Sequence, residues 1–131
     1  MQQRVEIARV LINHPRVLLM DEPFGALDAL TRSRMQELLL DLWARMRTTV
    51  VFVTHDIEEA LFLSDRIAIM SGRPGRIVEE IIVPYPRPRA YQEIIAMRSF
   101  GELKRSILAT LHKQAARLQH ATMESLAHGD D

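Results

Sequence analysis

Residues 17–28 read VLLMDEPFGALD, and this stretch decides how the rest of the chain is interpreted. A short apolar run ends in two adjacent carboxylates, Asp21 and Glu22, and a turn with proline and glycine leads to a third acid, Asp28. A continuous apolar run followed by turn residues is typical of a strand buried on both faces of a sheet. Neighbouring carboxylates repel each other and resist the loss of water, so the pair lies either on a solvated loop or against a cation.

The composition is that of a folded domain with a modest core. The chain has 131 residues, of which 47% are hydrophobic and 26% are charged. Seventeen acidic residues balance seventeen basic ones, so no overall basic field favours nucleic acid. The chain contains no cysteine, which excludes a disulfide framework and a thiolate metal site. No apolar stretch approaches the roughly 18–20 residues that span a bilayer.

Strand-like and helix-like segments alternate through the first two thirds of the chain. Helical spacing of apolar residues predicts helices, the second of them capped by Asp28 or Thr31, over 1–13, 29–47 and 57–65. Short apolar or β-branched runs predict strands over 16–21, 48–56, 66–71 and 76–84, the last of them at a sheet edge. This order predicts the α/β class, with right-handed crossovers and a parallel sheet flanked by helices.

The segment PYPRPRA at 84–90 has prolines in alternate positions and is predicted to be a stiff, extended connector. For the basic stretch around Arg87, a solvated linker is favoured over contact with lipid headgroups or a membrane subunit. Apolar residues after the connector predict one or two amphipathic helices. From His120 onward the chain is polar, and a frayed tail is expected.

Ionisable residues follow two of the predicted strands: Asp21 and Glu22 after the first, and His55 and Asp56 after the second. In open parallel sheets, functional groups gather at the carboxyl ends of strands. One carboxylate there can hold Mg²⁺ through water, a second can orient or deprotonate water, and an imidazole can contact a phosphate. Together these groups indicate phosphoanhydride hydrolysis. Taken singly, the acids fit a solvated loop and His55 fits a capping or surface residue, so only their combination in this order carries the hypothesis.

The ordered motifs resemble the second half of an ABC-transporter ATPase. VLLMDEP resembles the Walker B strand with its catalytic glutamate, GALD the D-loop and VTHD the H-loop, while MQQRVEIARVLINHP resembles the helix after the family's signature motif. The resemblance covers about Met1 to Val83. The stretches DEPFGALDALTR, RPGRI and PYPRPR look most like importers of the nitrate, sulfonate, taurine and bicarbonate group.

The resemblance implies a role for each of four residues. Asp21 would hold Mg²⁺ through water, Glu22 would polarise the attacking water, and His55 would contact the γ-phosphate of ATP. Asp28 would reach the nucleotide site of a second ATPase subunit. The implied partners are that second subunit and a transmembrane permease subunit, without nucleic acid, and the implied location is cytoplasmic, peripheral to the inner membrane.

The resemblance also implies a domain division. Residues 1–83 would form the carboxyl-terminal part of a P-loop NTPase core of the RecA-like, ABC type. Residues 84–90 would be the linker, and residues 91–131 a helical extension with a frayed tail.

The family's phosphate-binding pattern, Gly-x-x-x-x-Gly-Lys-Ser/Thr, does not occur in the 131 residues. In the family, the strand that feeds this loop lies between the strands that correspond to 48–56 and 66–71. Without that loop the triphosphate loses most of its contacts, so the 131-residue chain alone is predicted not to be a competent ATPase. The resemblance therefore implies that Met1 is a misassigned start or that the gene is truncated.

Three functions therefore remain open at this point. The first is the partial ATP-hydrolysing subunit of an ABC importer that couples hydrolysis to uptake of nitrate-, sulfonate- or taurine-type anions. The second is a non-catalytic remnant that acts only as an interaction module. The third, less favoured, is an ABC-type ATPase that acts on nucleic acid.

Overall fold

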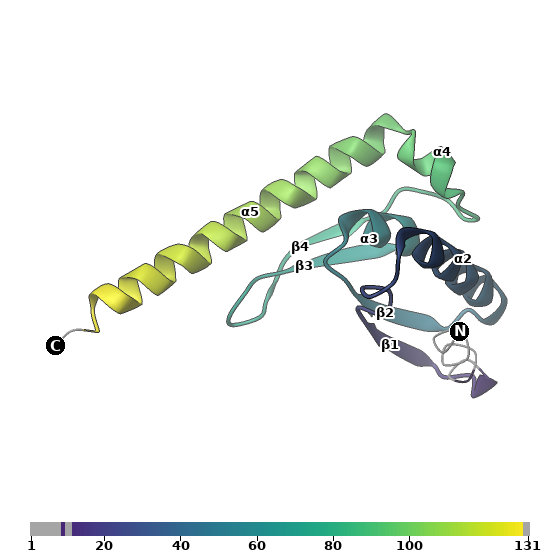
Figure 1. Ribbon diagram of the computed structural model, residues 1–131, viewed down its shortest axis with the longest axis horizontal. Coiled ribbons are helices and arrows are strands. Elements are labelled where there is room, and N and C mark those ends of the chain that lie inside the picture. Colours follow the sequence, from purple (N-terminus) through teal and green to yellow (C-terminus); the bar gives the residue numbers. More distant parts are fainter. Residues whose placement is uncertain (1–8, 10–11, 130–131) are drawn as a thin grey trace. The chain divides into compact units, whose positions relative to one another are not determined.

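The computed structural model describes Arg9 and residues 12–129. Its helices and strands are shown in Figure 1. The chain forms two compact units that divide between Asp56 and Ile57, and each is described on its own. The helix predicted over 1–13 lies largely outside the described residues.

The first unit is a strand–helix–strand motif of β1 (Val17–Asp21), α2 (Ala29–Met46) and β2 (Thr49–Val53). The two strands pair in parallel, with Val17 opposite Thr49 and Asp21 opposite Val53. Parallel neighbours need a long crossover, and α2 supplies it. The predicted parallel pairing of these two strands and the helix between them are confirmed.

One face of the β1–β2 pair is open, which corrects the prediction that these strands are buried on both faces. The side chains that alternate onto this face are 48–74% exposed: Val17, Leu19, Val51 and Val53. Leu18, which points to the opposite face, is only 8% exposed. A continuous apolar run suits a strand that is buried on both faces, but the described residues bury only one face of this pair.

The second unit contains α3 (Ile57–Leu63), the hairpin strands β3 (Arg66–Met70) and β4 (Ile77–Ile82), and the helices α4 (Tyr91–Ile95) and α5 (Arg98–Ala127). β3 and β4 pair antiparallel, so the prediction of one parallel sheet is wrong. Six residues separate these strands, whereas a parallel crossover needs about a dozen or more. β2 and β3 belong to different two-stranded sheets among the described strands.

The core of the second unit is built from side chains that are at most 6% exposed: Leu61, Phe62, Ile69, Val83, Tyr85, Ile94, Phe100 and Ile107. α5 runs along the hairpin and contacts it at two points. Thr110 Oγ1 donates to Glu79 Oε2 at 2.6 Å, and Leu118 packs directly on Gly72. The last turns of α5 extend beyond the hairpin (Figure 1). The expected frayed tail from His120 is wrong, because no glycine or proline interrupts the chain before Gly129 and the helix continues to Ala127.

Residues 84–90 have no regular structure, as predicted, but they are anchored and not a solvated linker. The Arg89 side chain is 1% exposed and its guanidinium donates to the carbonyl oxygens of Phe62, Ser64 and Tyr85. Arg87 donates to the Leu63 carbonyl and to Asp65. These arginines satisfy carbonyls at the end of α3 that the helix itself leaves unpaired.

Of the helices that the structure describes, none has the length and apolar character needed to cross a membrane.

Candidate active site

The ends of β1 and β2 place the predicted residues at one edge of the parallel pair. Asp21 is the last residue of β1 and lies opposite Val53, the last residue of β2. The Glu22 amide donates to the Val53 carbonyl at 2.7 Å, so the chain after β1 stays attached to the end of β2. The backbone of Glu22 therefore lies next to the start of the 54–56 loop.

Glu22 and His55 are in direct contact. Glu22 Oε1 lies 2.6 Å from His55 Nδ1, and the two side chains are 48% and 82% exposed. An ionised carboxylate only accepts hydrogen bonds, so with Glu22 ionised the hydrogen lies on Nδ1. The contact then directs Nε2, the other ring nitrogen, away from Glu22. Of the two adjacent acids that were predicted to lie near His55, Glu22 therefore contacts it directly.

Glu22 adopts a backbone conformation that most residues avoid. Its φ is 43°, in the left-handed region that favours glycine. The turn is closed by the Gly25 amide, which donates to the Glu22 carbonyl at 3.2 Å. Phe24, 1% exposed, anchors the turn against Phe52 of β2, with ring centroids 5.7 Å apart. A strained residue held in place by its surroundings points to a role for its side chain.

Asp21 is exposed and shares its strand face with Val17 and Leu19. Among the described residues, no group of three or more histidine, cysteine or acidic side chains is arranged to hold a metal ion. A single accessible carboxylate fits Mg²⁺, which keeps several of its waters and commonly takes one or two carboxylates plus phosphate oxygens. Asp21 is therefore compatible with the Mg²⁺ ion that the sequence implies.

Asp28 is the N-cap of α2, as one of the two predicted possibilities had it. Its two carboxylate oxygens accept from the Thr31 amide at 3.0 Å and from Thr31 Oγ1 at 2.8 Å. These hydrogen bonds from Thr31 lower the pKa of Asp28 below its ordinary value. Capping therefore accounts for the contacts of this carboxylate within the described chain.

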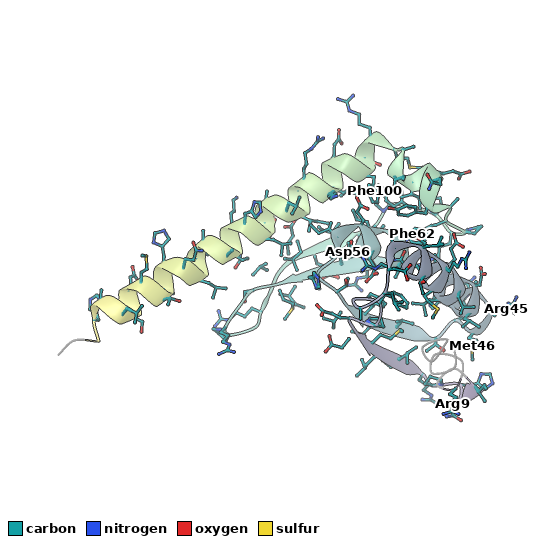
Figure 2. All side chains as sticks on the ribbon, in the orientation of Figure 1. Arg9, Arg45, Met46, Asp56, Phe62 and Phe100 are labelled. Atoms are coloured by element: carbon teal, nitrogen blue, oxygen red, sulfur yellow. The ribbon has the colours of Figure 1, made fainter. Side chains whose placement is uncertain are left out.

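Three side chains near the site, those of Arg32, Thr54 and Asp56, were not assigned a role from sequence. Arg32 Nη1 lies 3.4 Å from Asp56 Oδ2, and Thr54 Oγ1 accepts from the Asp56 amide at 3.0 Å. Asp56, which is labelled in Figure 2, is the last residue of the first unit. The spacing Thr-x-Asp after a strand is a recognisable local turn pattern. The Arg32 contact spans 24 residues and has no counterpart in sequence periodicity.

The strand–helix–strand motif with acids and a histidine at the strand ends agrees with comparisons to known proteins. The chain is 54% identical over 110 residues to an aliphatic sulfonates import ATP-binding protein of Bacillus cereus, covering 82% of this chain and 41% of the relative. It is 44% identical over 117 residues to a nitrate import ATP-binding protein of Synechococcus elongatus, covering 88% and 43%. A Brucella melitensis protein provisionally named as ATP-binding is 44% identical over 129 residues, covering 98% and 52%. No family model matches the chain.

The chain is therefore a homologue of ATP-binding subunits of ABC importers. Its match lies in the carboxyl-terminal part of the relatives. The chain spans about half or less of the length of these relatives.

Proposed function

We propose that the chain is the carboxyl-terminal part of the ATP-hydrolysing subunit of an ABC importer, with Glu22 and His55 at the catalytic centre. The observation that carries the proposal is the 2.6 Å contact between Glu22 Oε1 and His55 Nδ1 at the ends of two parallel strands. The similarity to sulfonate and nitrate import proteins supports it. It also favours nitrate-, sulfonate- or taurine-type anions as the solutes.

Glu22 acts in this proposal as the general base. One carboxylate oxygen stays on His55, and the other accepts a hydrogen bond from the attacking water and orients it. The strained backbone directs the side chain off the end of β1, where the nucleotide would lie. His55 donates from Nδ1 to Glu22 and from Nε2 to the γ-phosphate, so it works as an imidazolium between two anions.

Asp21 and Asp28 complete the proposed site. Asp21 would hold magnesium through water, and the metal would supply charge neutralisation at the phosphate oxygens. Asp28 fixes the start of α2, and the loop that it closes faces the nucleotide of a second ATPase subunit. We assign residues 1–83 to the ATPase core, 84–90 to the connector and 91–131 to the helical extension. The complete protein binds ATP and a permease subunit at the cytoplasmic side of the inner membrane.

The test joins the amino-terminal portion of the Bacillus cereus relative, which lies outside the matched region, to this chain. The joined protein is expected to hydrolyse Mg-ATP, and Glu22→Gln is expected to lower turnover by ~100-fold or more. Glu37→Gln, on the exposed side of α2, is the matched control and should retain turnover. The 131-residue chain alone should show none.

Equal turnover by the Glu22→Gln variant and the parent would contradict the assignment of the base. A joined protein that folds and binds ATP but never hydrolyses it would contradict the proposed function as a whole. Turnover by the 131-residue chain alone would contradict the requirement for a phosphate-binding loop.

A further inference from the structure

Arg32, the fourth residue of α2, connects the two loops that flank the candidate site. Its Nη1 lies 3.4 Å from Asp56 Oδ2, next to His55, and its Nη2 donates to the Leu27 carbonyl at 3.2 Å, next to Asp28. A guanidinium is planar and presents several donors in a fixed arrangement, so it can hold two partners at a set separation. We call this set the Arg32 bridge: Leu27, Arg32 and Asp56.

The bridge is poorly suited to a role in stability. The side chains of Arg32 and Asp56 are 32% and 38% exposed, and ion pairs at this exposure contribute little to the free energy of unfolding. Arg32 Nε is enclosed and has no hydrogen-bond partner among the described residues, which adds a cost. A side chain held this way at low net benefit to the fold is better explained by what it positions.

His55 is the residue that the bridge positions. Its ring is 82% exposed, so packing does not fix its orientation. Its neighbours are fixed instead: the Asp56 amide donates to Thr54 Oγ1 at 3.0 Å, and the Asp56 carboxylate meets Arg32. With both ends of the 54–56 loop held, the ring stays over Glu22.

We infer that Arg32 is a positioning residue for hydrolysis, which keeps His55 Nδ1 on Glu22 and couples the 25–28 turn to the 54–56 loop. The inference rests on the proposed function. Because the same guanidinium contacts both loops, a shift of the loop that carries Asp28 changes the support of His55. Arg32 itself touches neither nucleotide nor water in this scheme.

The first test uses the 131-residue chain and the ring ¹⁵N resonances of His55. In Arg32→Gln these resonances should move toward the averaged values of an exposed histidine such as His120, because the Nδ1 contact with Glu22 is no longer held. Arg32→Lys, which keeps the charge but not the planar fork, should lie between the parent and Arg32→Gln. Arg34→Gln, an exposed arginine on the same helix, should leave His55 unchanged.

The nearly isosteric Asp56→Asn serves as a second variant if Arg32→Gln does not fold. It removes the charge partner and should produce the same displacement of the His55 resonances. His55 resonances that stay at the parent values in the folded variants would overturn the inference.

The second test uses the joined protein. Arg32→Gln should lower kcat by ~10- to 100-fold, the size expected for misplaced catalytic groups, with little change in KM for ATP. An unchanged kcat, or an increase in KM alone, would overturn the positioning role. If the parent joined protein does not hydrolyse ATP, the proposed function fails, whereas the His55 resonances of the 131-residue chain still decide whether Arg32 positions the ring.

Discussion

The two strand pairs of the chain are similar in length but differ in how the fold uses them. The β1–β2 pair leaves Leu19 74% exposed and Val53 53% exposed on its open face. The β3–β4 hairpin also has an exposed side, with Ile77 63% and Ile82 77% exposed, but its Ile69 is buried at 4% exposure and α5 runs along it. Both pairs are therefore covered on one side only, and they differ in use: the second unit packs α5 on its hairpin, while the first presents its site residues at the ends of its strands. The predictions below test this difference, beginning with the largest expected effect.

Arg89 should be among the residues that matter most for the stability of the second unit. Its buried guanidinium supplies donors to three carbonyls, and Arg89→Met would leave them unpaired. We expect a loss of about 2–4 kcal/mol in the free energy of unfolding, measured by urea denaturation with helical circular dichroism. Arg98→Met, whose side chain is 92% exposed, is the control and should change it by less than about 0.5 kcal/mol. Equal effects at both arginines would contradict the anchoring role.

The close packing of α5 on the hairpin is tested at two glycines. A Cβ added at Gly72 would overlap the methyl groups of Leu118, whereas one added at Gly101 meets nothing within 4 Å. Gly72→Ala should cost about 1 kcal/mol, the low end for overpacking because Leu118 is partly exposed. Gly101→Ala, inside α5, should gain about 0.5–1 kcal/mol.

Leu118→Ala provides the check on the glycine prediction. In that background the methyl groups are gone, so Gly72→Ala should no longer be destabilising. An equal penalty with and without Leu118 would show that α5 does not pack there in solution.

Glu58 should give the second unit a pH-dependent stability. Its carboxylate accepts from Lys104 Nζ at 2.9 Å and Tyr91 Oη at 3.0 Å, and the Lys104 contact is the main cause of a pKa below the ordinary value of 4.5. The folded pKa is lower than the unfolded one, so the contribution is present above about pH 4.5 and is lost as pH falls through the folded pKa.

The contribution of Glu58 should be below about 1 kcal/mol, because both members of the ion pair are about two-fifths exposed. Urea midpoints of the parent and Glu58→Gln should differ at pH 7 and draw closer as pH falls below about 4.5. A difference between the two midpoints that widens as pH falls would contradict a stabilising role for the ionised Glu58 carboxylate.

The smallest effect is expected on the open face of the β1–β2 pair. Leu19→Thr should change the free energy of unfolding of the 131-residue chain by less than about 0.5 kcal/mol, because the side chain is already 74% exposed. Ile69→Ala, in the covered hairpin, should cost about 2–4 kcal/mol in the same urea assay. Similar losses at the two positions would mean that Leu19 is not exposed in solution.

Much of the element order was predictable because the apolar patterns are strong. The runs before Asp21 and Thr54 are short and β-rich, and the segment 29–47 has clear helical spacing. The structure confirms the two strands and the helix that these patterns predict. The sheet topology was less predictable, because strand type depends on turn length and pairing partner as well as on composition. The continuation of α5 through His120 was not predicted, because polar residues do not by themselves end a helix and the helix propensity there is adequate.

The site was predictable in outline only. Position at strand ends was enough to group Asp21, Glu22 and His55, and the structure joins the last two directly. The left-handed backbone of Glu22 and the Arg32 bridge were not predictable, because one is a glycine-favoured conformation at a residue that is not glycine and the other joins residues 24 positions apart. The anchoring of Arg89 was missed for the same reason, since its carbonyl partners leave no trace in sequence.

The central claim is that position 22 is kept for chemistry at some expense to the fold, and Glu22→Gly tests it most directly. In the 131-residue chain, glycine relieves the left-handed strain at φ 43° and should raise the free energy of unfolding by about 0.5 kcal/mol. Glu37→Gly, inside α2, should lower it by about 1 kcal/mol. In the joined protein Glu22→Gly should lose ATP turnover. A Glu22→Gly chain that is less stable than the parent, or a joined protein that keeps its turnover, would contradict the account.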